Sequence, residues 1–186
     1  MKSENPSIEK VLNLQLRKTP DPATDLICRL NHIKQQAYFN RREFIEMCSW
    51  KSPRPRRFYE SNSAAGIRRV SAKVFAAKSE KEKAELLTSL KGVAIPTASA
   101  ILTLTDPQDY GVIDIRVWQL LYRCGAVRTR PSGTGFSFDD WLEYLERLRC
   151  WAARFDVKAR DVERALFDYH KENQEGTLYR TGSARE

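Results

Sequence analysis

The chain of 186 residues has no apolar run approaching the roughly 20 residues that a membrane-spanning helix needs. Its beginning, MKSENPSIEK, lacks the apolar core of a secretory signal. We therefore expect a protein that is neither exported nor bound to a membrane. No two of its four cysteines stand at C-x2-C spacing and histidine occurs only twice, which argues against a zinc or iron–sulfur site. We expect reduced core thiols, no metal and no cofactor.

Alternation typical of β-strands is also lacking, and no internal repeat or low-complexity tract interrupts the chain. Apolar residues instead recur at spacings of three and four, which is the pattern of amphipathic helices. The predicted helical segments are 7–16, 25–39, 41–51, 62–77, 79–90, 116–124, 137–155 and 159–173. Asn62 or Ser61 is expected to cap the segment 62–77 and Ser79 the segment 79–90, while RTRPSGTGF (128–136) is expected to be a turn-rich loop. The length suffices for one domain with its own core, so we predict an all-α fold.

Basic residues are in excess, and the formal net charge is +8. Such a surplus favours a polyanionic partner, although charge that serves only solubility explains it equally well. Between residues 41 and 73 nine basic residues are interspersed with Trp50, Phe58 and Tyr59, as a surface that contacts nucleic acid requires. The alternative interpretation is a solvated helix face that covers core aromatics.

The stretch LKGVAIPTASAIL, residues 90–102, predicts a tight turn between two helices. Gly92 permits the turn, and Pro96 suits the first position of the second helix. The free N–H groups at the start of a helix form a ready phosphate site, but an ordinary helical hairpin has the same pattern. Asp114 follows in an apolar run before the next helix, where it could simply be an N-cap.

Together these two elements resemble the signature of the helix-hairpin-helix (HhH-GPD) DNA glycosylase superfamily. Its pattern is L-P-G-[VI]-G-x-x-[TK]-A, followed further along by V-D-x-[HR]-V. The matching positions are Leu90, Gly92, Val93, Ala98, Asp114, Arg116 and Val117. The resemblance extends from about Arg41 to Asn173 and implies two helical halves that flank a cleft. It divides the chain into an N-terminal helical extension or cap (1–40), a glycosylase-like core (41–175) and a frayed tail (176–186).

The resemblance implies that Asp114 is the catalytic carboxylate, which stabilises the sugar cation as the bond to a flipped base breaks. The residues expected to bind DNA are Gly92, Ala94, Thr97, Arg116, Arg54, Arg68 and Arg69. The residues expected to line the base pocket or to act as a wedge are Trp50, Lys51, Tyr110 and Trp118, with core packing as the alternative for Tyr110 and Trp118.

The sequence also departs from the family pattern. Family members that cut the DNA strand carry a lysine in the hairpin, and here that position falls at Pro96 or Thr97. The resemblance therefore implies a monofunctional enzyme that releases a base by hydrolysis. Ala94 replaces the second hairpin glycine, and together with the missing lysine this leaves open a DNA-binding protein without turnover. The basic surface also leaves open a helical adaptor for RNA or an acidic protein. As a glycosylase, the protein would act on double-stranded DNA as a monomer, in the cytoplasm at the nucleoid or in the nucleus of a eukaryote.

Overall fold

The structure is a computed structural model that describes residues 6–16, 18–174 and 178. All regular secondary structure in these residues is helical, which confirms the predicted all-α class. The helices are α1 (Ile8–Gln15), α2 (Thr24–Leu30), α3 (His32–Gln36), α4 (Arg41–Lys51), α5 (Arg56–Glu60), α6 (Ala64–Ala76), α7 (Glu80–Thr88), α8 (Ile95–Thr105), α9 (Ile115–Arg123), α10 (Phe138–Phe155) and α11 (Ala159–Glu172). None of the helices in the described part is long and apolar enough to cross a membrane.

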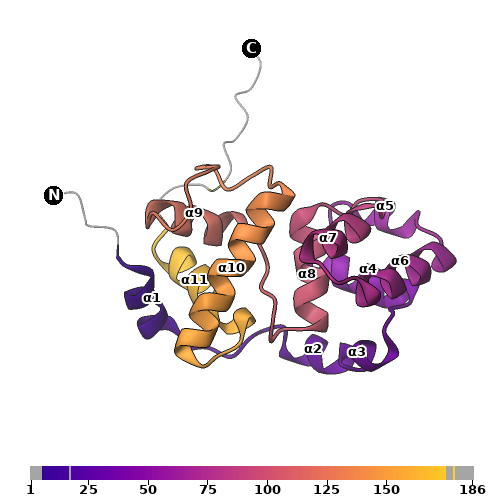
Figure 1. Cartoon of the computed structure of the whole chain (residues 1–186), viewed down its shortest axis with the longest axis horizontal. Coiled ribbons are helices and arrows are strands. Elements are labelled where there is room, and N and C mark those ends of the chain that lie inside the picture. The colour runs from indigo at the N-terminus through magenta and orange to yellow at the C-terminus, as the bar shows by residue number, and fades with distance from the viewer. Residues whose placement is uncertain (1–5, 17, 175–177, 179–186) are drawn as a thin grey trace, which may run out of the picture.

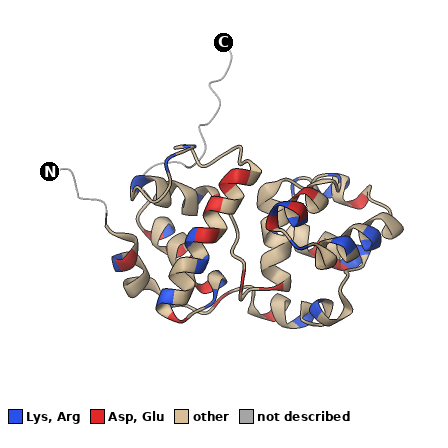
Figure 2. Ribbon diagram, in the orientation of Figure 1, with Lys and Arg blue, Asp and Glu red and all other residues tan. Residues whose placement is uncertain are grey.

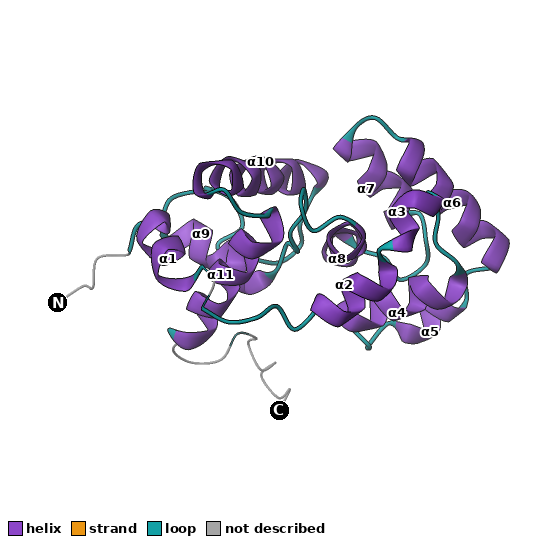
Figure 3. Cartoon of the chain, turned by 90° about the horizontal axis from the view of Figure 1, so that it is seen from below, coloured by secondary structure: helices purple, strands orange, loops and turns teal. Residues whose placement is uncertain are grey.

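The helices form two groups that lie side by side (Figure 1). One group contains α1, α9, α10 and α11, and the other contains α2 to α8. The view from below shows the same separation, with α8 on the side of its group that faces α10 (Figure 3). The chain passes between the groups twice, after α1 and after α8. The first 40 residues therefore contribute to both groups, because α1 packs against α11 while α2 packs against α8.

Short polar side chains determine the first residues of several helices. Asn40 accepts a hydrogen bond from the backbone N–H of Glu43, whose carboxylate in turn accepts one from the Asn40 N–H. This reciprocal capping box starts α4, and Ser137 with Asp140 forms a second one at the start of α10. Each box satisfies N–H groups that have no partner within the helix. Ser79, the predicted cap of α7, accepts a hydrogen bond from the Glu82 N–H.

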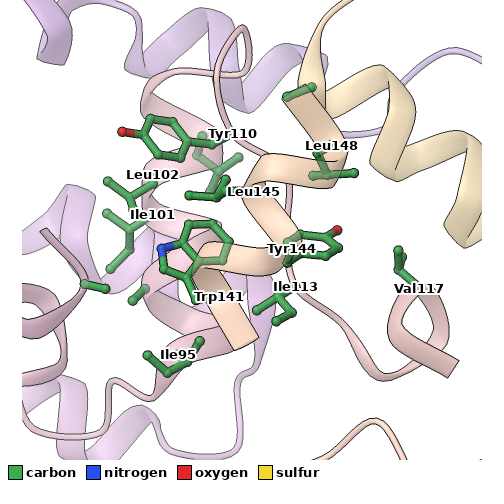
Figure 4. Packing of buried hydrophobic residues seen from close by; sticks show 14 of the residues in the cluster. Ile95, Ile101, Leu102, Tyr110, Ile113, Val117, Trp141, Tyr144, Leu145 and Leu148 are labelled. Atoms are coloured by element: carbon green, nitrogen blue, oxygen red, sulfur yellow. The ribbon is translucent and has the colours of Figure 1, made fainter. Parts of the chain in front are cut away.

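The two groups meet through an apolar core around α8 and α10 (Figure 4). Tyr110 stacks on Trp141 with ring centroids 6.4 Å apart, and Ile101 and Leu102 of α8 belong to the same cluster. The side chains of α8 are buried around almost its whole circumference. Its small residues, such as Ala98, allow neighbouring helices to approach closely. Because α8 is held from all sides, its N-terminus is a fixed point from which a site can be built.

The predicted segments match the observed helices closely, with local differences. The segment 25–39 is divided at Asn31 into α2 and α3, and α6 is capped by Ser63 rather than by the expected Asn62 or Ser61. All four cysteines are free thiols, but Cys28 and Cys150 are exposed, so the prediction of core thiols is wrong for these two. The predicted tail, 176–186, lies outside the described residues except for Leu178.

Candidate active site

The turn between α7 and α8 is built around Gly92, whose φ of +85° lies in the left-handed region. A Cβ atom at this position would lie 2.9 Å from the Phe58 Cβ and 2.9 Å from a ring carbon of Tyr59. Glycine is therefore required both for its backbone conformation and for space. Asn62 braces the turn, because its amide N–H donates to the Lys91 carbonyl (3.0 Å) and its carbonyl accepts from the Lys91 N–H (2.9 Å).

This braced turn fixes the N-terminus of α8. The helix begins at Ile95, and Pro96 occupies the second helical position, where it lacks an N–H that would have no partner within the helix. Ala94 is the N-cap residue and provides no side-chain hydrogen bond. The positive end of the α8 dipole therefore faces its surroundings without a capping side chain, which favours a nearby negative charge.

A second helix N-terminus lies opposite, at α9. Asp114 is its N-cap residue, and the carboxylate Oδ1 accepts a hydrogen bond of 2.9 Å from the Arg116 N–H. The capping interaction that the sequence suggested is thus present. It uses only one of the two carboxylate oxygens, and the Asp114 side chain keeps 17% of its surface exposed.

The other oxygen of Asp114 binds Lys51, the last residue of α4. The distance from Lys51 Nζ to Asp114 Oδ2 is 2.6 Å, and the Lys51 side chain is 18% exposed. Both charges are therefore mostly withdrawn from water, which costs free energy unless they remain paired. The pair joins the two helical groups, because α4 belongs to one group and α9 to the other.

Lys51 and Asp114 open into a cleft with a volume of about 570 Å³. One helical group lines it with residues 51–54 and 94–96, and the other with residues 114–115 and 133–136. The N-termini of α8 and α9 thus meet across the same space. The lining combines apolar side chains, such as Ile95 and Phe136, with the paired charges, which is the usual composition of a small-molecule site.

The loop before α10 closes one side of the cleft. Gly133 and Gly135 both have a φ of +69°, and a Cβ at Gly133 would lie 2.8 Å from the Ile115 carbonyl oxygen. The glycine thus lets the loop lie directly on the first residue of α9. Phe136 follows at the cleft, where it is half-buried and meets the buried Trp118 ring edge-on at a centroid distance of 5.3 Å.

A network of buried charged side chains interacts electrostatically with the Lys51–Asp114 pair. Arg160 of α11 binds both oxygens of Asp21, at 2.7 and 2.9 Å, and also contacts the carboxylate of Glu163. Burial raises the pKa of Glu163, and the positive charges of Arg160 and Lys51 offset this effect only in part. Partial burial of the Asp21 carboxylate raises its pKa, but the hydrogen bond and the positive charge of Arg160 outweigh this effect, so the pKa of Asp21 is lowered. Electrostatic interactions thus connect the N-terminal segment with Lys51 through Arg160 and Glu163.

The structure brings four of the residues that the sequence singled out to the cleft: Lys51, Arg54, Ala94 and Asp114. Gly92 lies two residues before Ala94, in the turn that positions α8. Thr97 is buried within α8. The side chain of Arg116 is directed to the other helices of its group, because its guanidinium lies 5.6 Å from the Phe167 ring centroid and donates to Gln174.

The remaining predicted residues lie elsewhere. Trp118 is completely buried and its indole N–H donates to the Thr129 carbonyl, while Tyr110 donates to Glu80 and accepts from Lys83. Both side chains therefore pack in the core, which was the alternative to a position in the base pocket. Trp50 is 36% exposed beneath the guanidinium of Arg160.

Arg68 and Arg69 are both exposed on α6, which lies at the end of the molecule away from α9 (Figures 1 and 3). Figure 2 shows the blue segments of α6 there, and other Lys and Arg residues spread over both helical groups. These two arginines are therefore remote from Asp114. A role for them in DNA binding requires a surface that extends over α6.

Sequence reasoning missed the contribution of residues 133–136 and of the network around Arg160. The stretch GTGF was recognisable as a turn with one aromatic residue, but nothing in it indicated a position opposite α8. Arg160 and Glu163 lie on the predicted last helix at a spacing of three, which indicates one face but not burial.

Comparison with known proteins gives no match to this chain among protein-family models, curated proteins or solved structures. The site therefore rests on the geometry of its own residues.

Proposed function

We propose that the chain is a DNA glycosylase, which binds double-stranded DNA, receives a flipped base in the cleft and hydrolyses its N-glycosidic bond. The observation that carries this proposal is the position of Asp114. Its carboxylate is held by the N-terminus of α9 and by Lys51, at the mouth of a cleft between two helical groups. The seven sequence positions that resemble the helix-hairpin-helix glycosylase signature include this aspartate and support the same assignment.

The chemistry of base removal suits such a carboxylate. As the bond between base and sugar breaks, positive charge develops at C1′ of the sugar. A fixed anion nearby stabilises that charge, and the effect is larger where water is mostly excluded. Asp114 is held in place by two hydrogen bonds, so little reorganisation is needed when the charge develops.

The dimensions and lining of the cleft also support a nucleotide ligand. Its volume of about 570 Å³ lies within the range of about 300–1,000 Å³ that is usual for small-molecule pockets. Phe136 offers a flat ring for stacking of an extruded base, and Ile95 adds an apolar wall. Both walls of the cleft come from one chain, so the proposed reaction needs no residue of a second copy.

DNA would reach the cleft along the turn at Gly92 and the start of α8, where the helix dipole favours a phosphate. Arg54, which lines the cleft, adds a positive charge beside this position, in a chain with a net charge of +8. Binding should therefore weaken steeply as the salt concentration rises. Arg54→Gln should reduce the slope of log K against log [salt] by about one. Arg154→Gln, at the far end of the 18-residue α10, is the control that leaves the slope unchanged.

The proposal is tested with duplexes that each carry one alkylated, oxidised, deaminated or hypermodified base. After incubation, released bases are separated and quantified, and the DNA is treated with alkali to cut at abasic sites. We expect release from at least one duplex, with alkali-dependent cutting at the modified position. Tight binding to the whole set without release from any member would contradict the glycosylase assignment.

A second candidate function is DNA binding without turnover. The observation in its favour is that both oxygens of Asp114 have protein partners, Arg116 and Lys51, as a purely structural carboxylate would. In that case no duplex releases a base, and Asp114→Asn binds DNA with the affinity of the wild type.

A further inference from the structure

A second groove lies between α4 and α5 and has a volume of about 530 Å³. Its lining includes Arg41, Arg42 and Ser49 of α4 with Arg56 and Glu60 of α5. The groove shares no lining residue with the cleft at Asp114, but the two are neighbours along the chain. Residues 51–54 line the cleft, whereas the residues just before and after this stretch, at 49 and 56, line the groove.

The positive charge of the groove is only partly neutralised. Arg41 donates hydrogen bonds to the backbone carbonyls of Glu60 (2.6 Å) and Asn62 (3.3 Å), which hold its guanidinium in place but carry no charge. Arg42 is exposed and has no ion pair within the part of the chain that the structure describes. Arg56 pairs with the Glu60 carboxylate, but both side chains are exposed, and such a pair contributes little.

The remaining polar residues of the groove favour an anion as well. The carboxylate of Glu46 binds Arg29 of α2, which lies outside the groove lining. The hydroxyl of Ser49 is buried and has no hydrogen-bond partner among the described residues, which costs free energy. An acceptor oxygen bound in the groove would remove that cost. A fixed arginine, an unpaired arginine and a hydroxyl without an acceptor together suit a phosphate, which has several oxygens.

We propose that this groove binds the phosphate backbone of a DNA strand where the strand leaves the cleft. The inference rests on the proposed function for the identity of its ligand, but it requires DNA binding only and no base release. From Ser49 to Arg41 the groove follows α4 for about 12 Å, at about 1.5 Å per residue. One DNA strand rises about 3.4 Å per nucleotide, so this length corresponds to about three or four nucleotides.

The first test measures the affinity of the full chain for an unmodified duplex by fluorescence anisotropy at several salt concentrations. Arg42→Gln removes an exposed charge without an ion pair, so it should fold like the wild type, which circular dichroism checks. It should weaken binding about tenfold and lower the slope of log K against log [salt] by about one. Arg154→Gln removes an exposed arginine of the other helical group and should bind like the wild type.

Ser49→Ala separates a binding role from a structural one. The hydroxyl has no protein partner, so its removal should not lower the free energy of unfolding. The same variant should bind the duplex severalfold more weakly, because a donor to the phosphate is lost. A residue that serves only the packing of α4 would not combine these two results.

The second test locates the contact on the DNA. A duplex with one uncleavable abasic-site analogue places that position in the cleft, and each nearby phosphate is replaced in turn by an uncharged methylphosphonate. In the wild type, replacement within about four nucleotides on one side of the analogue should weaken binding. In Arg42→Gln the same replacement should have no further effect, because one charge of the pair is already absent.

The outcomes separate this inference from the proposed function. Wild-type affinity in both Arg42→Gln and Ser49→Ala would overturn the inference, and it is the result expected if the groove serves an acidic protein segment or a free phosphate ion. A methylphosphonate map that is identical in the wild type and Arg42→Gln would also overturn it. Base release alongside either result leaves the glycosylase assignment intact. Weaker binding by Arg42→Gln, with no base released from any modified duplex, supports the inference and contradicts the glycosylase assignment as stated.

Discussion

Asp114 and Lys51 lie 63 positions apart in the sequence and are joined by a contact of 2.6 Å between the two helical groups. The same carboxylate caps α9 through its other oxygen. Asp114 thus has two structural tasks in addition to the chemical one proposed for it. Substitutions can separate these tasks, because asparagine caps a helix about as well as aspartate but carries no charge.

The capping task predicts a difference between two variants of Asp114. Asp114→Ala removes the cap and the ion pair, and we expect a loss of about 1–3 kcal/mol in the free energy of unfolding. Asp114→Asn keeps the cap and should lose less than Asp114→Ala, by about 1 kcal/mol. Urea unfolding monitored by circular dichroism measures both values. Equal losses in the two variants would mean that the cap contributes nothing.

The close approach at Gly92 predicts a cost beyond that of its backbone conformation. Gly92→Ala places a methyl group 2.9 Å from both Phe58 and Tyr59, so we expect a loss of stability of at least about 2 kcal/mol. Gly125 is the matched control, because its φ is +71° and no atom would lie within 4 Å of a Cβ there. Gly125→Ala should cost only about 1 kcal/mol. A smaller loss for Gly92→Ala than for Gly125→Ala in chemical unfolding would contradict the packing described here.

The network behind the site predicts a strong dependence on Arg160. Arg160→Met leaves the buried Glu163 and the part-buried Asp21 without their cation, which should cost about 3–5 kcal/mol of stability. Adding Glu163→Gln to this variant should restore part of the loss. Arg56→Met breaks only an exposed pair with Glu60 and should cost less than about 1 kcal/mol. A similar effect of Arg160→Met and Arg56→Met would show that the network contributes little.

His170 predicts a loss of stability in mild acid. Burial lowers its pKa from 6.5 to about 4, and the charges of Arg123 and Arg116 act in the same direction, while Asp114 acts weakly against them. Between pH 6.5 and pH 4 the unfolded chain therefore binds a proton that the folded chain does not. The contribution of neutral His170 to the free energy of unfolding is fully present above pH 6.5. This contribution falls by on the order of 2 kcal/mol as the pH is lowered towards 4.

His170→Gln, which does not titrate, isolates this contribution from the carboxylates that titrate in the same range. The difference in unfolding free energy between the wild type and this variant is measured from pH 7.5 to pH 4. We expect the wild type to lose stability relative to the variant as the pH falls. Parallel curves of unfolding free energy against pH for the two proteins would mean that His170 has the same pKa in the folded and the unfolded chain.

Local features of the structure could be predicted from the sequence. The spacing of apolar residues gave α4 at its observed bounds, and Ser79 was recognised as the cap of α7. Gly92 as the turn and Asp114 as the start of α9 follow from rules that involve only neighbouring residues. Such signals depend on a few adjacent positions, so one sequence contains them in full.

Contacts between distant segments could not be predicted in the same way. Lys51 was selected as a pocket residue, but nothing in its surroundings indicates that its partner is Asp114. The aromatic residues show the same limit. Trp118 was plausible in a core or in a pocket and Phe136 was not singled out, and only the packing of α9 against the loop before α10 decides that Trp118 is buried and that Phe136 lines the cleft.

The most direct test of the central claim is the rate of base release under single-turnover conditions by the wild type and by Asp114→Asn. Asp106→Asn is the matched control, because Asp106 also pairs with a lysine but lies outside the cleft lining. If Asp114 stabilises the departing sugar cation, Asp114→Asn should release base about 100- to 1,000-fold more slowly. Asp106→Asn should match the wild type, and both variants should still bind the duplex. Equal rates for the wild type and Asp114→Asn, with both proteins folded, would contradict the account.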